Sequence, residues 1–208
     1  MNTTILIPCL NEAETIYFVI NQIATAFPEI PIIVVDNGST DGSTELIKKT
    51  KALLILEHSP GKANAIKAAL PFIKTSHTIL IDADNEYKIG CIQHLLNHEY
   101  VHKTMVVGVR PIDNLLLSSK LANRLIQFCL YLQFRHWIPD CLSGLRIVPT
   151  YLLTKMKSSG FEMETELNKM CLADNFKIIS VPIDYEPRTV GKKIKPWDMF
   201  KLMKVAIL

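Results

Sequence analysis

The sequence predicts an α/β fold in which a mostly parallel central sheet is flanked by helices. Short apolar segments of strand length alternate with helical segments through about the first 80 residues. The strand interiors are almost entirely apolar, as in parallel strands that are covered on both faces. Polar residues gather directly after these strands, at the edge where such sheets bind ligands. No repeat or long linker interrupts the chain, so we expect one domain over residues 1–208.

The first three elements follow from apolar spacing. Residues 4–9 form a short apolar run of strand length. Residues 11–27 follow a helical pattern, because their apolar positions recur at intervals of three and four. Residues 32–35 predict a second buried strand, which ends at Asp36 in a loop rich in turn residues.

The alternation then continues. A helix is expected from Thr44 onward, with Asp41 or Ser43 as its N-cap. After it come a strand at 53–56, a helix at 63–73 and a strand at 78–81. After Asp84 the pattern is less regular, and we expect a strand at 106–109, a long apolar helical stretch at 115–137 and a strand at 178–181.

Composition excludes several classes of protein. The hydrophobic fraction is 49% and the mean hydropathy is +0.20, which favours membrane contact. No apolar stretch approaches the roughly 20 residues of a bilayer span, and the first residues do not resemble a secretory signal. Five cysteines without metal-ligand spacing predict reduced thiols in the cytosol. A net charge of +3 is too weak to indicate nucleic acid as a partner.

Asp82 and Asp84 are the first candidates for chemistry. They directly follow a predicted strand, two positions apart, and their carboxylates can converge on one hard cation. Mg²⁺ or Mn²⁺ bound by one or two carboxylates together with substrate phosphates is a common arrangement. An isolated Asp-x-Asp pair is more often a solvated turn, so the prediction depends on its context.

Other strand-end residues supply that context. Asp36 can accept hydrogen bonds from a nucleobase or a ribose, and Gly38 allows the backbone to wrap closely around a ligand. Lys62, near the start of a helix, can offer a positive charge to a diphosphate. Asp41 is either a ligand or a helix cap.

Four ordered segments together resemble the family 2 glycosyltransferases, which have a GT-A fold. They are residues 7–12, 34–41, 61–65 and 82–84. The resemblance implies a donor-binding half over about 1–110 and an acceptor half over about 111–208. It implies that the nucleotide-sugar contacts Pro8, Asn11, Glu12, Asp36, Gly38, Asp41, Lys62, Asp82, Ala83 and Asp84, and that Asp82 and Asp84 hold the metal. Asn37 stands where many relatives have a second Asp.

The second half is similar to the dolichyl- and undecaprenyl-phosphate sugar transferases. The similarity rests on residues 108–110, 119–123, 140–146, 160–166 and 181–188, followed by Gly191. A polyprenyl phosphate already carries its nucleophilic oxygen, so it needs cations more than a strong base. The candidates to bind the acceptor phosphate are Arg110, Ser119, Arg124, Arg146 and Arg188. A surface or structural ion pair is the alternative for each arginine.

Two acidic positions complete the catalytic candidates. Glu162 and Glu166 would share one helix face, and Glu166 is expected to organise the acceptor side or the sugar. Asp140 is either a general base or a brace for the loop before Ser143. The expected catalytic set is Asp82, Asp84, Arg110, Arg146 and Glu166.

The last segment has two interpretations. Lys192, Lys193 and Lys195 precede Trp197 and an apolar stretch, a pattern that suits the surface of an anionic membrane. A C-terminal helix packed on the core would give the same pattern.

Taken together, these residues and the resemblance predict a particular enzyme. It is an inverting transferase that moves a sugar from a UDP- or GDP-sugar to a polyprenyl phosphate, with Mg²⁺ or Mn²⁺, at the cytoplasmic face of a membrane. The alternatives are the same donor chemistry with a soluble or other lipid acceptor, and a non-catalytic nucleotide-sugar-binding protein. A nucleotidyltransferase is disfavoured, because residues 8–12 are not a Gly-rich, Arg-containing loop.

Overall fold

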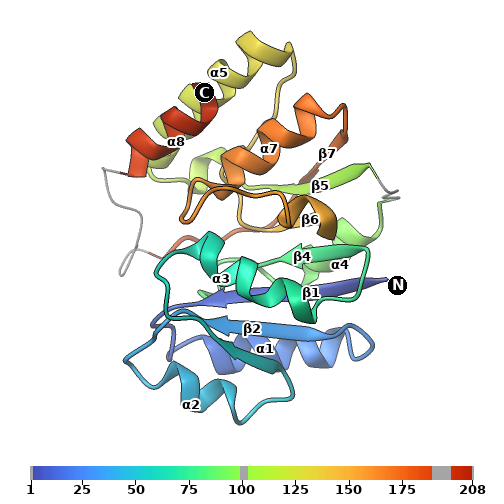
Figure 1. Cartoon of the computed structure of the whole chain (residues 1–208), viewed down its shortest axis with the longest axis vertical. Helices are drawn as coiled ribbons and strands as arrows, with labels where there is room; N and C mark the ends of the chain where they lie inside the picture. The colour runs from blue at the N-terminus through green and yellow to red at the C-terminus, as the bar shows by residue number, and fades with distance from the viewer. Residues whose placement is uncertain (1, 99–102, 189–197, 208) are drawn as a thin grey trace.

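The computed structural model describes residues 2–98, 103–188 and 198–207. Its centre is a seven-stranded sheet in the order β3-β2-β1-β4-β6-β5-β7, with helices on both faces (Figure 1). The strands are β1 (Thr3–Cys9), β2 (Ile32–Asp36), β3 (Leu53–Leu56), β4 (His77–Leu80), β5 (Thr104–Val109), β6 (Arg146–Pro149) and β7 (Lys177–Pro182). The helices are α1 (Ile16–Ala26), α2 (Ser43–Ile47), α3 (Lys62–Ala69), α4 (Gly90–Leu96), α5 (Leu117–Phe134), α6 (Thr150–Leu153), α7 (Met163–Ala173) and α8 (Asp198–Ile207), with 3₁₀ turns η1 (Leu70–Phe72) and η2 (Ile112–Asn114).

The predicted mostly parallel sheet is confirmed, with one antiparallel strand in its interior. β3, β2, β1 and β4 run parallel to one another, and β7 is parallel to β5. β6 was not predicted, and it runs antiparallel to both β4 and β5. Arg146, its first residue, pairs with Leu80 at the end of β4. The second half of the chain therefore contributes a strand beside the Asp82 loop.

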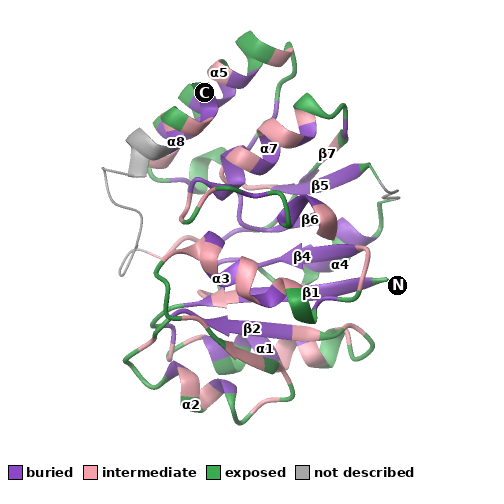
Figure 2. Ribbon diagram, viewed as in Figure 1, coloured by how far each residue is buried: buried purple, intermediate pink, exposed green. Residues whose placement is uncertain are grey.

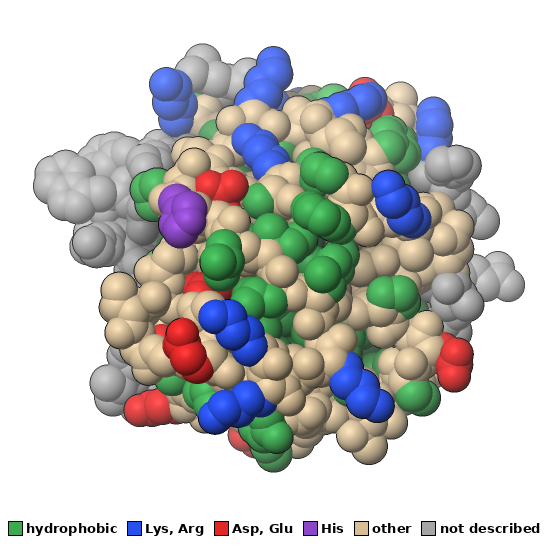
Figure 3. All heavy atoms as spheres, turned by 60° about the horizontal axis from the view of Figure 1, so that its bottom comes forward, with side chains coloured by type: hydrophobic (Ala, Val, Ile, Leu, Met, Phe, Trp, Pro, Cys, Tyr) green, Lys and Arg blue, Asp and Glu red, His purple; other side chains and the backbone are tan. Residues whose placement is uncertain are grey.

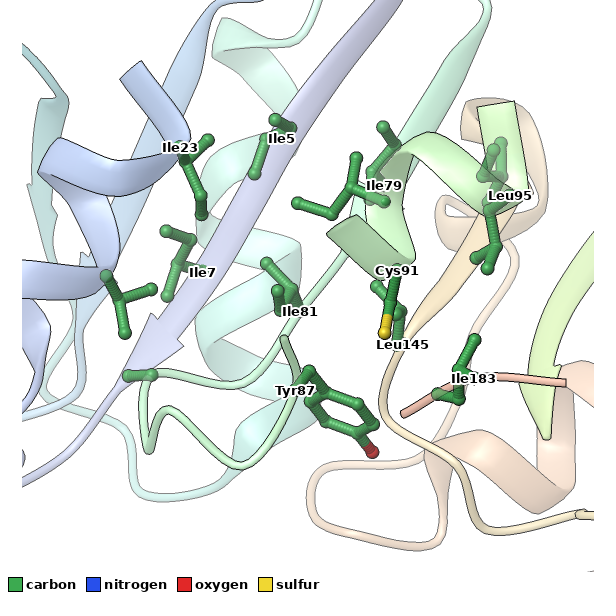
Figure 4. Close-up of a cluster of buried hydrophobic side chains, with 14 of the residues drawn as sticks. Ile5, Ile7, Ile23, Ile79, Ile81, Tyr87, Cys91, Leu95, Leu145 and Ile183 are labelled. Atoms are coloured by element: carbon green, nitrogen blue, oxygen red, sulfur yellow. The ribbon is translucent and has the colours of Figure 1, made fainter. Parts of the chain in front are cut away.

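Apolar side chains alternate between the two faces of the sheet, and each face forms its own core. Ile5 and Ile7 of β1 pack with α1 and α4, whereas Leu6 packs on the opposite side with α3 and α7. Figure 4 shows the first core, in which Ile23 of α1 lies over the β1 side chains. Purple, buried strands run through the middle of the molecule in Figure 2. Burial on both faces explains why the strands are almost wholly apolar.

The first helix begins later than the periodicity predicts. α1 starts at Ile16 rather than at residue 11. Asn11 has a φ of 50°, and the backbone N–H groups of residues 11–13 donate to side chains of the loop after β2. Residues 11–15 are therefore a connecting loop whose donors are satisfied across the strand ends.

α5 and α8 form a smaller third cluster beside the main sheet. Leu202 and Ala206 of α8 pack with Ile126 and Leu130 of α5. The described part of the C-terminal segment therefore agrees with the packed-helix interpretation. Residues 189–197, which include Gly191, Lys192, Lys193, Lys195 and Trp197, lie outside the described residues. Among the helices that the structure describes, none has the length and hydropathy needed to cross a membrane.

Candidate active site

Asp82 lies directly after β4, next to a buried lysine that comes from another element. Lys62 is the first residue of α3, and its Nζ lies 2.5 Å from Asp82 Oδ1 and 2.8 Å from Glu164 Oε1 of α7. The side chains of Lys62 and Glu164 are 9% and 6% exposed, whereas that of Asp82 is 27% exposed. Burial alone would lower the pKa of Lys62, but the two carboxylates outweigh it and raise that pKa above its usual value. Asp82 is thus the solvent-facing end of a charged triad.

A glycine and a tyrosine shape the other side of Asp82. A Cβ atom on Gly144 would lie 2.1 Å from Asp82 Oδ2, so only glycine fits against this carboxylate. The backbone N–H of Gly144 donates to the hydroxyl of Tyr87 over 2.8 Å. Figure 4 shows the Tyr87 hydroxyl at the rim of the apolar core, pointing away from Ile81. The loop before β6 is therefore held closely against the end of β4.

Asp84 lies in a second cluster of charges. Arg188 Nη2 is 3.9 Å from Asp84 Oδ2, and the same guanidinium forms a bidentate pair with Glu12 at 2.7 and 2.9 Å. Glu86 accepts a hydrogen bond from the backbone N–H of Arg188 over 2.8 Å. Burial, together with the nearby carboxylates of Asp82 and Glu86, raises the pKa of Asp84 to about 7.

The donor atoms at Asp82 and Asp84 fit a hard divalent cation. Both side chains offer carboxylate oxygens, the ligands that Mg²⁺ and Mn²⁺ prefer, and both are partly open to solvent. Besides burial, repulsion from Asp82 and Glu86 raises the pKa of Asp84, and a bound cation would relieve this repulsion. The described residues hold no group of three or more His, Cys, Asp and Glu side chains placed to bind a metal. A cation at this pair would need further ligands from a bound substrate.

Asp36 is buried at the end of β2 and organises the loop that follows. Its carboxylate accepts hydrogen bonds from the backbone N–H of Ser39, over 2.9 Å, and from the hydroxyl of Thr44. Gly38 and Gly42 have φ values of 85° and 94°, a region that glycine adopts without steric cost. The expected turn chemistry is confirmed. In this structure Asp36 holds the loop, and its expected contact with a nucleobase or ribose stays a prediction.

Asp41 joins the loops after β1 and β2. Its carboxylate accepts the backbone N–H of Ala13 over 2.9 Å and both the N–H and the hydroxyl of Ser43. The N-cap of α2 is Gly42, and no side chain caps it, so the expected Asp41 or Ser43 cap is wrong by one residue. Burial acts to raise the pKa of Asp41, but the hydrogen bonds from Ser43 and Ala13 hold it below its usual value.

Asn37 ties the end of β2 to the segment before α3. Its amide nitrogen donates to the carbonyls of Glu57 and Ser59 over 3.0 and 2.8 Å, and its amide oxygen accepts the N–H of Gly61 over 2.8 Å. A carboxylate cannot make the first two of these bonds. The Asn at this position therefore has a structural reason that the sequence alone did not show.

The expected arginines have different surroundings. Arg110 makes a bidentate pair with Asp140, at 2.7 and 2.9 Å, and lies over the Tyr185 ring. Asp140 also accepts a hydrogen bond from Asn123, which favours its role as a brace. Arg124, on α5, stacks on Trp137 with Cζ 5.4 Å from the ring centroid. Ser119 is half-buried in the first turn of α5.

The structure corrects the role expected for Arg146. It is fully buried, and its guanidinium donates to carbonyls of Cys141, Ser143 and Glu164 and to the side chain of Asn168. The geometry contradicts its expected role as a ligand of the acceptor phosphate, because its donors are used inside the protein. Arg146 instead holds the loop before β6 against α7.

Glu162 and Glu166 both bind the backbone of the loop that precedes α7. Glu166 accepts the N–H groups of residues 157 and 158 and the Ser158 hydroxyl, and Glu162 accepts the N–H groups of residues 159 and 160. Backbone donors, rather than a cation or a sugar, thus stabilise these two neighbouring carboxylates. The expectation that Glu166 organises the acceptor side or the sugar stays a prediction.

Glu164, between them, is the site residue that sequence reasoning missed. It contacts Lys62 directly. A signal was present: Glu164 shares a helix face with Leu167, Asn168 and Cys171, which are all buried. An acidic residue on a buried face needs a cationic partner.

The structure therefore brings together five of the predicted residues. They are Glu12, Lys62, Asp82, Asp84 and Arg188. Pro8 and Asn11 lie at the end of β1, and the carbonyl of Ala83 accepts the Thr15 hydroxyl over 2.7 Å. These residues position the strand ends around the charged group.

Comparison with known proteins identifies relatives across most of the chain. A family model described as glycosyl transferase family 2 matches residues 4–155. Glycosyltransferase AglJ of Haloferax volcanii is 30% identical over 90% of this chain, which spans 64% of that relative's length. The polyprenol monophosphomannose synthase of Mycolicibacterium smegmatis is 25% identical, over 91% of this chain and 79% of its own.

A solved structure shares the fold. Glucosyl-3-phosphoglycerate synthase from Mycobacterium tuberculosis, in complex with Mn²⁺, UDP-glucose and phosphoglyceric acid, superposes with a TM-score of 0.74 at 19% identity. The match covers 99% of this chain and 78% of that one. The expected GT-A fold is confirmed by this similarity.

Proposed function

Since the chain belongs to glycosyl transferase family 2, we propose that it transfers a sugar from a UDP- or GDP-sugar to a polyprenyl phosphate, with inversion at the anomeric carbon. One observation carries the proposal. Two partly open carboxylates, Asp82 and Asp84, lie at the end of β4 beside the cations Lys62 and Arg188. Opposite charges arranged in this way suit a diphosphate and its counter-cation.

The donor is placed across the ends of β1, β2 and β4. Asp82 and Asp84 would hold Mg²⁺ or Mn²⁺, which on binding neutralises charge on the departing diphosphate. The neighbouring ammonium of Lys62, 2.5 Å from Asp82 Oδ1, orients the Asp82 carboxylate. The loops held by Asp36 and Asp41 would surround the nucleoside.

The reaction needs little acid–base chemistry from the protein. An oxygen of the acceptor phosphate forms a bond to the anomeric carbon, while the bond from that carbon to the donor's β-phosphate oxygen breaks. The electron pair leaves with the nucleoside diphosphate, so charge develops beside Asp84 and Arg188. Arg188 is 28% exposed, and it is the best-placed arginine for the phosphates. Arg110 would act indirectly, by fixing Asp140 and Tyr185.

The choice of acceptor has specific support. The M. smegmatis relative is named a polyprenol monophosphomannose synthase, and its similarity extends through the acceptor half of the chain. Such an acceptor is embedded in a bilayer, so we place the enzyme at the cytoplasmic face of a membrane.

A soluble phosphorylated acceptor is the second candidate. The structural neighbour was solved with phosphoglyceric acid, an acceptor that also presents an anionic oxygen. The donor site would be unchanged in that case. A third candidate, a protein that binds nucleotide-sugars without turnover, would keep the site and lack product formation.

The test is a panel of UDP- and GDP-sugars with Mn²⁺ or Mg²⁺, in which release of nucleoside diphosphate is measured with a short-chain polyprenyl phosphate, with phosphoglyceric acid or with neither. Release that requires both metal and lipid supports the proposal. Release with phosphoglyceric acid instead selects the second candidate, and metal-dependent binding without release selects the third.

Asp82→Asn should lower the rate by about 100-fold or more, whereas Glu186→Gln, which changes an exposed ion pair with Lys88, should not.

A further inference from the structure

One side of α5 is an exposed apolar surface. Its residues are Leu117, Leu121, Leu125, Phe128, Tyr131 and Leu132, which we call the outer α5 face. Leu117 is 83% exposed, Leu121 59% and Phe128 55%. These positions recur at intervals of three and four, so they share one side of the helix. A continuous stripe of this kind is a mark of an interaction surface rather than of scattered surface residues.

The opposite side of α5 is already occupied. Ile126 and Leu130 are buried with Leu202 and Ala206 of α8, and the two helices lie side by side at one end of the molecule (Figure 1). A helix that is apolar on both sides normally buries both. Among the described residues, α8 covers only the inner side. The outer α5 face is therefore left exposed by the residues that the structure describes.

Charge indicates which partner this is. No acidic residue occurs between Leu115 and Pro139, whereas Lys120, Arg124 and Arg135 all lie there. The β3 end of the sheet, turned toward the viewer in Figure 3, also exposes apolar side chains, but acidic and basic groups are mixed around them. The outer α5 face combines exposed apolar groups with charge of a single sign over this stretch of sequence. That combination favours an anionic, apolar surface.

The aromatic residues of this region suit a boundary between water and hydrocarbon. Tyr131 and Trp137 are 40% and 44% exposed and meet edge to face, with ring centroids 6.3 Å apart. Arg124 lies over the Trp137 ring and Arg135 over the Tyr131 ring. Amphipathic rings and long basic side chains place apolar parts in a membrane while their polar ends stay in water.

We propose that the outer α5 face docks the protein on the surface of an anionic lipid bilayer. The helix would lie in the plane of the interface, with its leucines and Phe128 among the acyl chains and with Lys120, Arg124 and Arg135 at the headgroups. A chain of contacts also connects α5 to the candidate active site. Asn123, on the inner side of α5, donates to Asp140, which pairs with Arg110. The purpose of the docking would be access to a lipid-borne acceptor, and this purpose rests on the proposed function. The docking itself does not rest on it.

The experiment is flotation of the 208-residue protein with vesicles of phosphatidylcholine alone or with about one third phosphatidylglycerol. The test variant is Leu121→Gln/Phe128→Gln. The matched control is Leu56→Gln/Phe72→Gln, which changes the same two residue types at similar exposure, 54% and 52%, away from α5. We expect wild type and control to float with the anionic vesicles and the test variant to partition at least about tenfold more weakly. Binding should also weaken as salt rises, because screening reduces headgroup attraction.

Three results would overturn the docking proposal. The first is a folded wild-type protein that does not float with anionic vesicles. Equal binding by the test variant and the control is the second. The third is a dimer, detected by light scattering, that the test variant dissociates, because the face would then join two copies of this chain. Vesicle binding without any sugar transfer would support the docking and count against the proposed function instead.

Discussion

At the scale of single residues, the site depends on two carboxylates that share one buried ammonium. Lys62 lies between Asp82 and Glu164, and its ammonium is almost fully buried. A buried ammonium is stable only because both carboxylates are within contact distance. Glu164 thus supports Asp82 through Lys62 on the buried side of the triad, while Asp82 is partly exposed to solvent.

Removal of Glu164 should destabilise the protein through Lys62. We expect Glu164→Gln to lower the free energy of unfolding by about 1–3 kcal/mol, because one of two charge partners of a buried ammonium is lost. Lys62→Met should also destabilise, yet the double variant should be less affected than the sum of the two. Urea unfolding of all four proteins measures the coupling, expected to be about 1 kcal/mol or more. Additive effects within about 0.5 kcal/mol would show that the contact is energetically unimportant.

Asn37 gives a second prediction at this scale. Asn37→Asp should lower the free energy of unfolding by about 1–3 kcal/mol, because a carboxylate cannot donate to the carbonyls of Glu57 and Ser59. Thermal or urea unfolding measures this change, with the exposed Asn2→Asp as control. Unchanged stability together with an altered preference between UDP- and GDP-sugars would show that Asn37 acts on the base instead.

At the scale of elements, the ends of strands decide where charge can gather. β1, β2 and β4 end at one edge, and the loop before β6 closes against them through Gly144. That loop has no regular structure of its own. Contacts from Arg146, Tyr87 and Asp140 hold it in place.

The fit of Gly144 against Asp82 can be tested with a single methyl group. Gly144→Ala would place Cβ 2.1 Å from Asp82 Oδ2, so the carboxylate must move. We expect sugar transfer to fall by about 100-fold, as for other small displacements of reacting groups. Gly90→Ala, at the start of α4, meets nothing within 4 Å and should leave the rate unchanged. Equal rates for both variants would show that Asp82 tolerates the displacement.

The elements show which parts of the structure were accessible from sequence. Strands β1 to β4 contain short apolar runs of strand length, and these runs predicted them. β6 has only four residues, begins with Arg146 and ends with Pro149, and its place between β4 and β5 depends on pairing across the chain. Asp82 and Asp84 follow from their position at a strand end, and Lys62 follows from its position at the start of a helix. Arg146 was misassigned, because sequence shows a cation but not whether carbonyls of its own fold occupy it.

At the scale of the whole molecule, the donor and acceptor halves share one sheet. β6, from the second half, separates β4 and β5. Ile147 within β6 and Leu145 directly before it belong to the main core. A fragment of residues 1–110 should therefore lack a cooperative unfolding transition, since the strand that joins β4 to β5 is missing. Circular dichroism with urea unfolding, beside the full chain, measures this. A fragment that unfolds cooperatively and binds UDP with Mn²⁺ would show that the donor half is an independent domain.

The central position of β6 also sets an order of events during synthesis on the ribosome. β4 is complete at Leu80, but the strand that pairs with its open side ends at Pro149. At about 5–20 residues per second, that side of the nascent sheet waits several seconds for its neighbour. An unpaired strand edge is a template for pairing with other chains. Nascent chains of this protein should therefore depend on chaperones until β6 emerges, and slowing translation between these two points should increase aggregation.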